Sequence, residues 1–389
     1  MVLNENARRA IAFHKRLKGK IVITGKISKL LPGEIQLIYT PGVASVCKEI
    51  YHDVGKMYEL TSKGDNVAIV TDGTRILGLG NIGPYAALPV MEGKSVLYRE
   101  FGNISAFPLC LNVTKKEEII SAVKAIEPAF GAINLEDIES PKVLEISEEL
   151  ENSLSIPVFH DDRHGTSVVA LAALYNSLKL VTKQLPSIKI IIAGAGSAGY
   201  GISKLLVAAG CKNVIVTDSD GAIYKGRARN MNKYKEELAK ITNPKREKGG
   251  LDEVMKNADV FIGVSGKKNL VNSRLIKEMG RDPIIFALTN PDPEIKPGIA
   301  KKAGAKIVAT GSYLYPNKVN NALVFPHLMR VILDKKIRKI TADLLLATAR
   351  AIASTIPDKK LDHNNIIPDM YDKRIQKNIT QALSRLRLK

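Results

Sequence analysis

The sequence predicts an α/β fold with two parallel sheets and a helical C-terminus. Three observations lead to this prediction. Short apolar runs alternate with amphipathic segments, which is typical of parallel strands joined by helices. Two of these runs end in pairs of acidic residues. Another runs directly into a glycine-rich turn at residues 194–199.

In the first part of the chain, the runs 130–135 and 156–159 read as buried strands. The segment 140–151 between them has helical spacing, with Ser140 as its N-cap. The two strands of such a unit should lie parallel in one sheet. The earlier stretch 72–83 is too rich in glycine for a helix, so we expect it to form turns that line a site.

The two acidic pairs are Glu136–Asp137 and Asp161–Asp162, and each follows one of these strands. Both pairs should therefore lie at the same carboxyl edge, where open α/β sheets bind ligands. Carboxylates that converge there would repel one another unless a cation lies among them, and Mg²⁺ or Mn²⁺ prefers oxygen ligands. For a single pair, solvated turn residues or helix caps would be the better explanation. Two pairs at one edge favour a metal site.

The second part begins with an apolar helix from Thr166 to about residue 181 and continues with the signature of a Rossmann-type dinucleotide-binding domain. A strand at 188–193 enters the glycine turn, a helix follows, and a second strand ends in Asp218, nineteen residues past the last glycine. This order of strand, glycine turn, helix, strand and acid indicates dinucleotide binding far more specifically than the glycines alone would. The turn would place pyrophosphate at the helix N-terminus, and Asp218 would accept the ribose hydroxyls. The turn residues are Gly194, Ala195, Gly196, Ser197, Ala198 and Gly199.

The choice between NAD⁺ and NADP⁺ is less sharply indicated. Asp218 and Asp220 would repel a 2′-phosphate, which favours NAD⁺. NADP⁺ stays open because several basic residues follow closely and could receive a phosphate, although they could equally form a solvated helix face. These residues are Lys225, Arg227, Arg229, Lys233 and Lys235.

Two later runs, 259–266 and 283–288, fit further parallel strands whose ends border the nicotinamide. Asn290 follows the second run and could contact cofactor or substrate, with a turn role before proline as the equal alternative. Beyond about residue 325 the pattern is helical, first to about residue 356 and again near the C-terminus.

Composition narrows the class of protein. The 389 residues are 45% hydrophobic and include no run of eighteen apolar residues, so we expect no membrane span and no membrane partner. The absence of a secretory signal pattern and three scattered cysteines without metal spacing predict a cytoplasmic protein whose thiols are reduced core residues. The net charge of +19 raises nucleic acid as a partner, but the basic residues are dispersed and there is no Trp. We therefore interpret the charge as solvated surface that also steers small anions.

Seven stretches in order resemble the malic enzyme family, in its short microbial form without an appended acyltransferase domain. The resemblance covers nearly the whole chain, including tyrosine, arginine and lysine motifs before the acidic pairs. It implies a malate- and metal-binding catalytic domain at 1–160 and an NAD(P)-binding domain at 161–389 whose C-terminal helices pack back toward the first. The stretches are 39–44, 71–80, 89–94, 134–138, 160–166, 315–321 and 366–368.

The resemblance implies oxidative decarboxylation of (S)-malate to pyruvate and CO₂ with reduction of NAD(P)⁺, and also decarboxylation of oxaloacetate. It makes Lys94 the base that takes the C2 hydroxyl proton and Tyr39 the acid that protonates C3. A lysine can act as a base only if burial or a nearby cation depresses its pKa. Taken singly, Lys94 would pass for a solvated lysine and Tyr39 for a tyrosine before a turn.

The family's metal ligands fall on Glu136, Asp137 and Asp162, and Asp161 becomes a partner of the lysine. Its substrate residues fall on Arg75, Asn290 and Asn321, where Arg75 would bind a malate carboxylate. The bound Mg²⁺ or Mn²⁺ would polarise malate. His160 and His164 are core or supporting residues in this scheme.

The same resemblance predicts a homodimer and leaves open whether Tyr39 acts in its own subunit. Rival functions are a malolactic-type enzyme that releases lactate, a dinucleotide-binding regulator without activity, and a basic nucleic-acid binder. The chain departs from the family pattern at Ser105, Asn112, Arg163 and Ser312. These departures affect substrate range, cofactor choice and subunit contacts more than reaction type.

Overall fold

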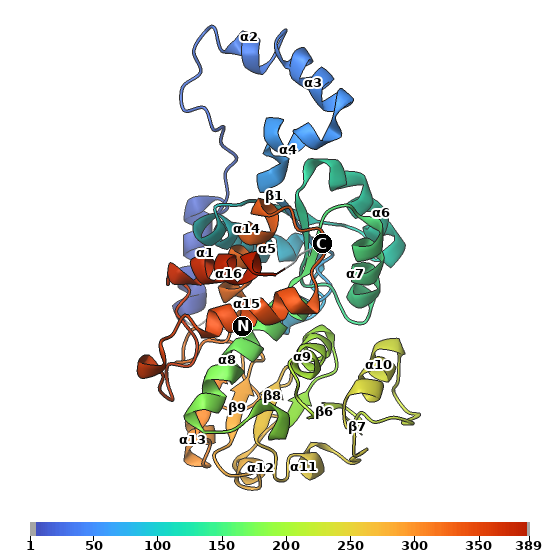
Figure 1. The fold of residues 1–389 in the computed structure, drawn as a ribbon, viewed down its shortest axis with the longest axis vertical. Coiled ribbons are helices and arrows are strands. Elements are labelled where there is room, and N and C mark those ends of the chain that lie inside the picture. The colour runs from blue at the N-terminus through green and yellow to red at the C-terminus, as the bar shows by residue number, and fades with distance from the viewer. Residues whose placement is uncertain (1–4, 387–389) are drawn as a thin grey trace.

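The computed structural model describes residues 5–386, which fold around two sheets, one above the other along the long axis (Figure 1). The upper sheet has the order β2-β1-β3-β4, and the lower sheet has the order β10-β9-β8-β5-β6-β7. Every strand pair is parallel except β6–β7. The predicted α/β class, with a Rossmann-type sheet and a helical C-terminus, is confirmed.

The upper sheet buries both of its faces. Val67 and Ile69 of β1 belong to the core on the α5 side, whereas Ala68 and Val70 belong to the core under α6 and α7. This two-sided burial explains why the strands are continuous apolar runs. The strands are β1 (Asn66–Thr71), β2 (Ser105–Cys110), β3 (Ala132–Leu135) and β4 (Val158–His160). The helices are α5 (Gly83–Gly102), α6 (Lys116–Ile126) and α7 (Lys142–Ser153).

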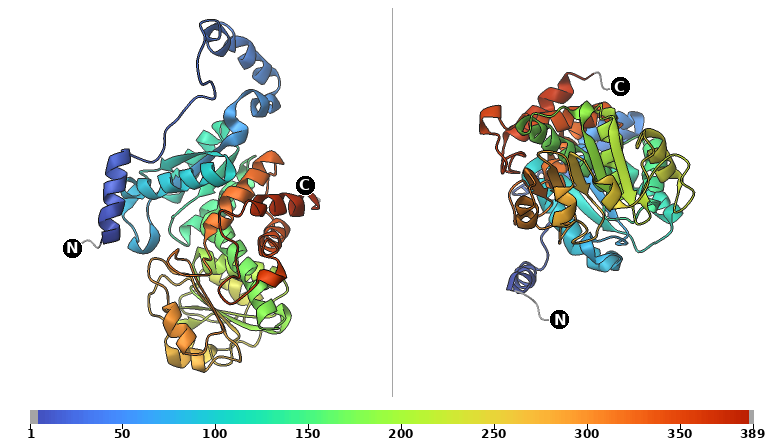
Figure 2. Two further views of the ribbon diagram at one scale, coloured as in Figure 1. Left: turned by 90° about the vertical axis from the view of Figure 1, so that its left-hand side faces the viewer. Right: turned by 90° about the horizontal axis from the view of Figure 1, so that it is seen from below.

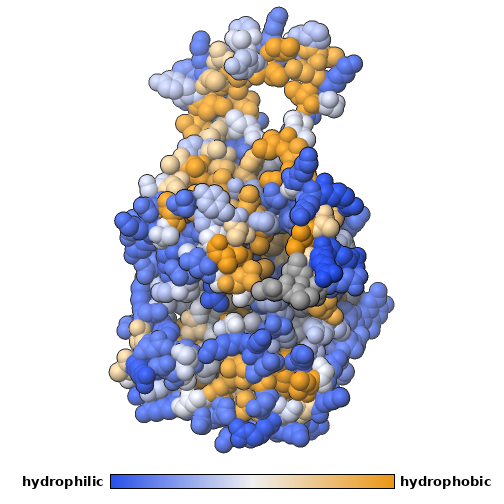
Figure 3. All heavy atoms as spheres, turned by 180° about the vertical axis from the view of Figure 1, so that it is seen from behind, coloured by the Kyte–Doolittle hydropathy of each residue, from blue (hydrophilic) through white to orange (hydrophobic). Residues whose placement is uncertain are grey.

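The segment before β1 projects from the body and forms an arm, residues 19–60 (Figures 1 and 2). None of its helices has a buried residue, and α1, which precedes the arm, also has none. Hydrophobic residues cover much of the projecting part at the top of the space-filling view (Figure 3). The helices are α1 (Glu5–Leu17), α2 (Ile35–Ile38), α3 (Val43–His52) and α4 (Met57–Leu60).

The lower sheet is likewise enclosed by helices, and its strands divide their side chains between two cores. The strands are β5 (Lys189–Ala193), β6 (Asn213–Asp218), β7 (Gly221–Ala222), β8 (Val260–Gly263), β9 (Ile284–Ala287) and β10 (Ile307–Thr310). The helices are α8 (Thr166–Leu180), α9 (Ser197–Ala208), α10 (Lys233–Ile241), α11 (Leu251–Val254), α12 (Ser273–Lys277) and α13 (Pro297–Lys302).

The C-terminal helices join the two halves. Helix α14 packs on α5 of the upper half, α15 packs on α8, and α16 packs on both α14 and α15 (Figure 2). These helices are α14 (Phe325–Asp334), α15 (Ala342–Ala353) and α16 (Arg374–Ser384). The short helical turns are η1 (Val54–Lys56), η2 (Ser62–Asp65), η3 (Leu77–Leu79), η4 (Glu127–Ala129), η5 (Asp161–Gly165), η6 (Leu185–Ser187), η7 (Asn321–Leu323) and η8 (Asp358–Lys360).

Some local expectations are wrong. Helix α7 begins two residues after Ser140, and its N-terminus has no side-chain cap. Thr166 does not cap α8, because the π-helical turn η5 leads directly into that helix and the Thr166 hydroxyl bonds Asn321. The predicted helix at 325–356 is interrupted between α14 and α15. The cysteines are free, but Cys47 is exposed rather than part of the core.

Candidate functional site

A cleft of about 800 Å³ lies where the carboxyl edge of the upper sheet meets the glycine turn of the lower one. Its walls come from both halves of the chain. Glu136, Asp137, Asp161 and Asp162 line one side, and Gly196 with its two following residues lines the other. The acidic pairs and the nucleotide turn, which are far apart in sequence, therefore share one space.

The acidic pairs meet because β3 and β4 are parallel neighbours that end together, with Leu135 opposite His160. After β3 the backbone turns sharply, and Asp137 adopts a positive φ of 49°. Its carbonyl accepts a hydrogen bond from the Arg75 backbone N–H at 3.0 Å, which ties the acidic turn to the glycine-rich loop. After β4 the chain enters η5, a π-helical turn of the kind often found at functional sites.

Lys94 occupies the centre of the acidic group. Its Nζ lies 2.7 Å from Glu136 Oε2 and 2.7 Å from Asp161 Oδ2, and the side chain is 6% exposed. The ammonium also lies over the Phe325 ring, 3.9 Å from its centroid. Sequence reasoning missed Phe325; its signal was an aromatic residue four positions after the end of the stretch 315–321.

Hydrogen bonds continue from Lys94 in both directions. On one side, Asn134 Nδ2 donates to Glu136 Oε2 at 2.9 Å, and the Tyr98 hydroxyl donates to Asn134 Oδ1 at 2.6 Å. On the other side, Asn321 Nδ2 donates to Asp161 Oδ2 at 3.1 Å. Asn321, which belongs to η7, is thus joined to the lysine through Asp161. This network fixes the lysine between two carboxylates.

Burial and mutual repulsion raise the pKa values of the acids. Burial raises the pKa of Asp137 to about 9, and the neighbouring Glu136 and Asp162 charges add to it. Burial raises the pKa of Glu136 to about 7 against the opposing pull of Lys94. The pKa of Asp162 is also raised, by burial and by Asp161. Burial alone would lower the pKa of Lys94, but Asp161 and Glu136 outweigh it and the pKa is raised. The depressed pKa that a lysine base requires is therefore not present in this arrangement.

The donor set suits a divalent, oxygen-seeking cation. The acids lie together with one lysine among them, and Asp161 Oδ1 is buried without a hydrogen-bond partner in residues 5–386. Within the described residues, however, no three His, Cys, Asp or Glu side chains are gathered around one point as metal ligands would be. Glu136 instead forms an ion pair with Lys94. The residue types fit Mg²⁺ or Mn²⁺, whereas their present orientation favours the lysine.

The nucleotide side of the cleft has the geometry of an anion cradle. Gly199 allows close packing, since a Cβ there would lie 1.8 Å from the Gly194 carbonyl oxygen. Gly196 instead faces open space, with its nearest neighbour 3.9 Å from a hypothetical Cβ. Helix α9 begins at Ser197, whose hydroxyl is buried and has no partner among the described residues. Free N–H groups and an unpaired hydroxyl at a helix N-terminus suit a pyrophosphate.

Two loops that follow β8 and β9 close the cleft, and a buried carboxylate joins them. Glu294 is 0% exposed. Its Oε1 accepts from the Ser265 backbone N–H at 3.1 Å and the Thr289 hydroxyl at 2.5 Å, and its Oε2 accepts from the Thr289 N–H at 3.2 Å. Sequence reasoning missed Glu294, because an acid in a loop rich in Pro and Asp looks like a solvated residue.

Of the residues that the sequence predicts to act on the substrate, three lie in the cleft and one does not. Arg75, Asn290 and Asn321 all line the cleft. Tyr39 does not line it and is 69% exposed. The helices on either side of Tyr39, α2 and α3, lie in the projecting arm, away from α5 (Figure 1), and α5 is the helix that carries Lys94. His160 and His164 are buried, and burial lowers the pKa of both, that of His160 to about 3.

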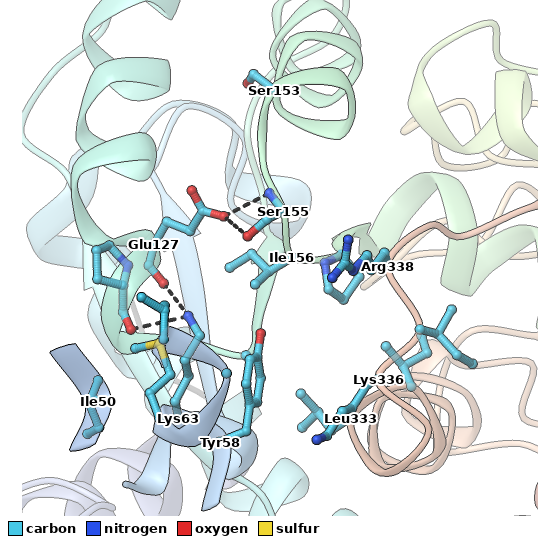
Figure 4. A pocket seen from close by; sticks show the side chains of 18 residues that line it. Ile50, Tyr58, Lys63, Glu127, Ser153, Ser155, Ile156, Leu333, Lys336 and Arg338 are labelled. Atoms are coloured by element: carbon cyan, nitrogen blue, oxygen red, sulfur yellow. Dashed lines mark hydrogen bonds between the residues drawn. The ribbon is translucent and has the colours of Figure 1, made fainter. Parts of the chain in front are cut away.

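A second pocket of about 600 Å³ lies at the base of the arm (Figure 4). Ile50 and Met57 of the arm line it together with Ile156 and Leu333 of the body. The Lys63 ammonium donates to the carbonyls of Glu127, Pro128 and Phe130 at 2.8, 3.2 and 2.6 Å. The Lys63 charge is compensated in this way, and the rest of the lining is mainly apolar apart from Glu127, Lys336 and Arg338.

Two family models match most of the chain, and several relatives are similar to it over most of its length. The family described as malic enzyme, N-terminal domain, matches residues 17–151, and malic enzyme, NAD binding domain, matches residues 164–385. The bifunctional malic/malolactic enzyme of Bacillus subtilis is 46% identical over 97% of this chain and 92% of its own length. The NAD-dependent malic enzyme of Geobacillus stearothermophilus is 47% identical over 95% of this chain and 77% of its own length.

A solved structure of an NAD-dependent malic enzyme from Thermotoga maritima superimposes with a TM-score of 0.92. It is 45% identical and the match covers 97% of this chain and 99% of that one. NADP-dependent malic enzymes also occur among the relatives. Within residues 5–386, none of the helices has the length and apolar character needed to cross a membrane.

Proposed function

The chain belongs to the malic enzyme family, whose members depend on NAD or NADP, and from this premise we propose that it converts (S)-malate and NAD⁺ to pyruvate, CO₂ and NADH. The observation that carries the proposal is the position of Lys94. Its ammonium lies between Glu136 and Asp161, in the same cleft as the nucleotide turn. A base beside both a dinucleotide and a group of oxygen ligands is what malate oxidation needs.

In the proposed reaction, a cation held by the acids would draw Glu136 away from Lys94 and lower the pKa of the lysine. Lys94 could then accept the C2 hydroxyl proton while a bound nicotinamide would take the C2 hydride. Loss of CO₂ from C3 then leaves an enolate, and Tyr39 protonates its C3. Glu136, Asp137 and Asp162 would hold Mg²⁺ or Mn²⁺, which polarises the C2 oxygen and accepts electron density during decarboxylation. Arg75 binds a carboxylate of malate, and Asn290 and Asn321 orient the substrate. Asp161 holds the lysine in place.

The test is a spectrophotometric assay with malate, with NAD⁺ or NADP⁺, and with or without Mn²⁺. We expect reduced cofactor and an equal amount of pyruvate when Mn²⁺ is present, and release of CO₂ from oxaloacetate in a separate assay. If no reduced cofactor forms with metal present, the proposal is wrong.

A malolactic activity is the second candidate, because a relative that is 46% identical is named as a bifunctional malic/malolactic enzyme. Such an enzyme keeps NADH bound and returns the hydride to pyruvate. Lactate formed without net NADH would favour this candidate over the first. The intact set of Tyr39, Lys94 and the acidic residues argues against a regulator without activity.

We also propose that the chain is divided near residue 160 into a catalytic and a nucleotide-binding domain, and that it works as a homodimer. The exposed apolar surface of the arm supports a dimer: Val22 and Ile23 are each 82% exposed, and Leu37 is 69% exposed. The apolar pocket at the base of the arm offers a place for side chains of a second copy. Tyr39 would then reach the Lys94 of the partner subunit rather than that of its own.

Mixing two inactive variants tests this arrangement. Tyr39→Phe and Lys94→Met should each be inactive when pure. If Tyr39 acts across the interface, random exchange of subunits gives hybrid dimers with one intact site, and activity returns to about a quarter of the native value. Mixtures that stay inactive after verified subunit exchange would assign Tyr39 to its own subunit.

A further inference from the structure

The carboxyl end of β6, where the adenine ribose of the cofactor should bind, carries one carboxylate paired with two cations. Asp218 is the last residue of β6. It lies next to the glycine turn, because the backbone N–H of Gly194 donates to the carbonyl oxygen of Thr217, the residue before Asp218. Asp218 Oδ2 accepts from Arg227 Nη2 at 2.6 Å and from Lys235 Nζ at 2.7 Å. All three side chains are largely buried, with exposed fractions of 9%, 5% and 12%. Two cations thus lie against one carboxylate.

Arg227 has no donor left for a ligand. Its Nε donates to the Arg229 carbonyl, its Nη1 to the carbonyls of Gly221 and Ala222, and its Nη2 to Asp218 and to the Asn230 carbonyl. A guanidinium has five N–H donors, so every one of them is in use. Only the bond to Asp218 involves a charged partner.

Lys235 is satisfied in the same way. Its ammonium donates to Asp218 Oδ2, to the Asn230 carbonyl at 2.9 Å and to Asn230 Oδ1 at 2.9 Å. An ammonium has three donors, and all three are in use. Removal of the Asp218 carboxylate would therefore free one donor on Arg227 and one on Lys235, both directed at the same point.

Asp218 keeps little capacity for the ribose. Arg227 and Lys235 donate to its Oδ2, to which the Asn230 side-chain amide also donates at 3.3 Å, and the Asp220 backbone N–H donates to Oδ1 at 2.9 Å. A carboxylate has about four acceptor positions, so a ribose hydroxyl would have to share or displace one of these four donors. Burial would raise the pKa of Asp218, but hydrogen bonds from Arg227 and Lys235 outweigh it and the pKa is lowered. The group is thus an anion at neutral pH.

We propose that Asp218 selects NAD⁺ mainly by occupying Arg227 and Lys235, and that these two cations form a latent site for the 2′-phosphate of NADP⁺. This inference rests on the proposed dinucleotide-dependent function. In the native protein a 2′-phosphate meets an anion whose neighbouring cations are already paired. Without the Asp218 carboxylate, it meets two cations with one free donor each.

The test measures binding of ADP-ribose and of 2′-phospho-ADP-ribose by calorimetry, without malate or metal. The native protein should bind ADP-ribose more tightly. Asp218→Ser should bind the 2′-phosphate ligand about 10- to 100-fold more tightly than the native protein does, as two charge-assisted hydrogen bonds form. In Asp218→Ser/Lys235→Met this gain should largely disappear. Asp220→Asn, the matched control, removes the same charge without touching either cation and should leave the ratio of the two affinities nearly unchanged.

The proposal is overturned if Asp218→Ser keeps the native ratio of affinities for the two ligands. It is also overturned if Asp218→Ser/Lys235→Met still binds the 2′-phosphate ligand as tightly as Asp218→Ser does. If Asp218→Ser fails to fold in a thermal unfolding assay, Lys235→Met alone decides, because it leaves the Asp218–Arg227 pair intact. It should strengthen the discrimination against the 2′-phosphate about tenfold, and an unchanged ratio rejects the proposal. Since no turnover is measured, failure of the malate assay would leave this result standing.

Discussion

Glu294 offers the sharpest test of how the cleft is held together. Replacement by Gln keeps the shape of the side chain but changes one acceptor oxygen into an amide donor. The Gln oxygen would take the Oε1 position, where the Ser265 N–H, the Ser265 hydroxyl and the Thr289 hydroxyl converge. The amide nitrogen would then face the Thr289 backbone N–H, which loses its acceptor at 3.2 Å.

The expected loss follows from these contacts. An unsatisfied buried N–H costs about 1–3 kcal/mol, and the remaining bonds lose their charged acceptor. We therefore expect Glu294→Gln to lower the free energy of unfolding by about 2–4 kcal/mol, and Glu294→Ala by more, because both backbone N–H groups are then unpaired. The loops also line the cleft, so KM for NAD⁺ should rise more than kcat falls.

Urea unfolding and steady-state kinetics with malate measure both effects. Glu253→Gln is the matched control, because Glu253 lies exposed on α11 and the same charge is removed. If Glu294→Gln is as stable as this control and has an unchanged KM, Glu294 does not hold the two loops as described.

Three further predictions follow from the site and its supports. Gly201→Ala should destabilise the protein by about 2–4 kcal/mol in thermal unfolding, because a Cβ there would lie 2.2 Å from the Arg163 carbonyl oxygen. Gly298→Ala is the control: its Cβ would meet open space in α13, so this change should be neutral or slightly stabilising. Asp162→Asn should abolish Mn²⁺-dependent turnover yet leave the melting temperature without metal unchanged or higher, since it relieves repulsion among buried acids; full activity would remove Asp162 from the ligands. Exhaustive chelation should stop turnover of the native enzyme, and added Mn²⁺ should restore it; turnover that persists would exclude a required metal.

The fold could be predicted because its signals are local. The strands next to the acidic pairs are continuous apolar runs, and the strand–glycine–helix order around Gly194–Gly199 leaves few alternatives. The parallel arrangement then follows from the connections and brings Glu136 and Asp162 to one edge. Errors occur at helix ends, as at Ser140 and Thr166, within the predicted helix 325–356, which is interrupted, and at Cys47, which is exposed.

The position of Tyr39 could not be predicted, because it depends on whether an arm without buried residues folds back or reaches outward. Glu294 escaped notice for a different reason. Its partners, Ser265 and Thr289, lie on loops after two different strands and become neighbours only when β8 and β9 pair. Sequence patterns report the periodicity of one segment, whereas the hydrogen bonds of a buried carboxylate depend on several segments at once.

The buried carboxylates of this chain fall into two physical groups. Asp218 receives donors from Arg227, Lys235 and a backbone N–H, and its pKa is lowered. At the edge of the upper sheet, Asp137 and Asp162 have no comparable donors among the described residues, and their pKa values are raised by burial and by neighbouring carboxylates. A buried acid with a full set of donors stabilises the fold, whereas one without them destabilises it until a proton or a cation arrives. The contrast supports assigning the second group to a metal, since Asp218 and Glu294 receive their donors from the chain itself.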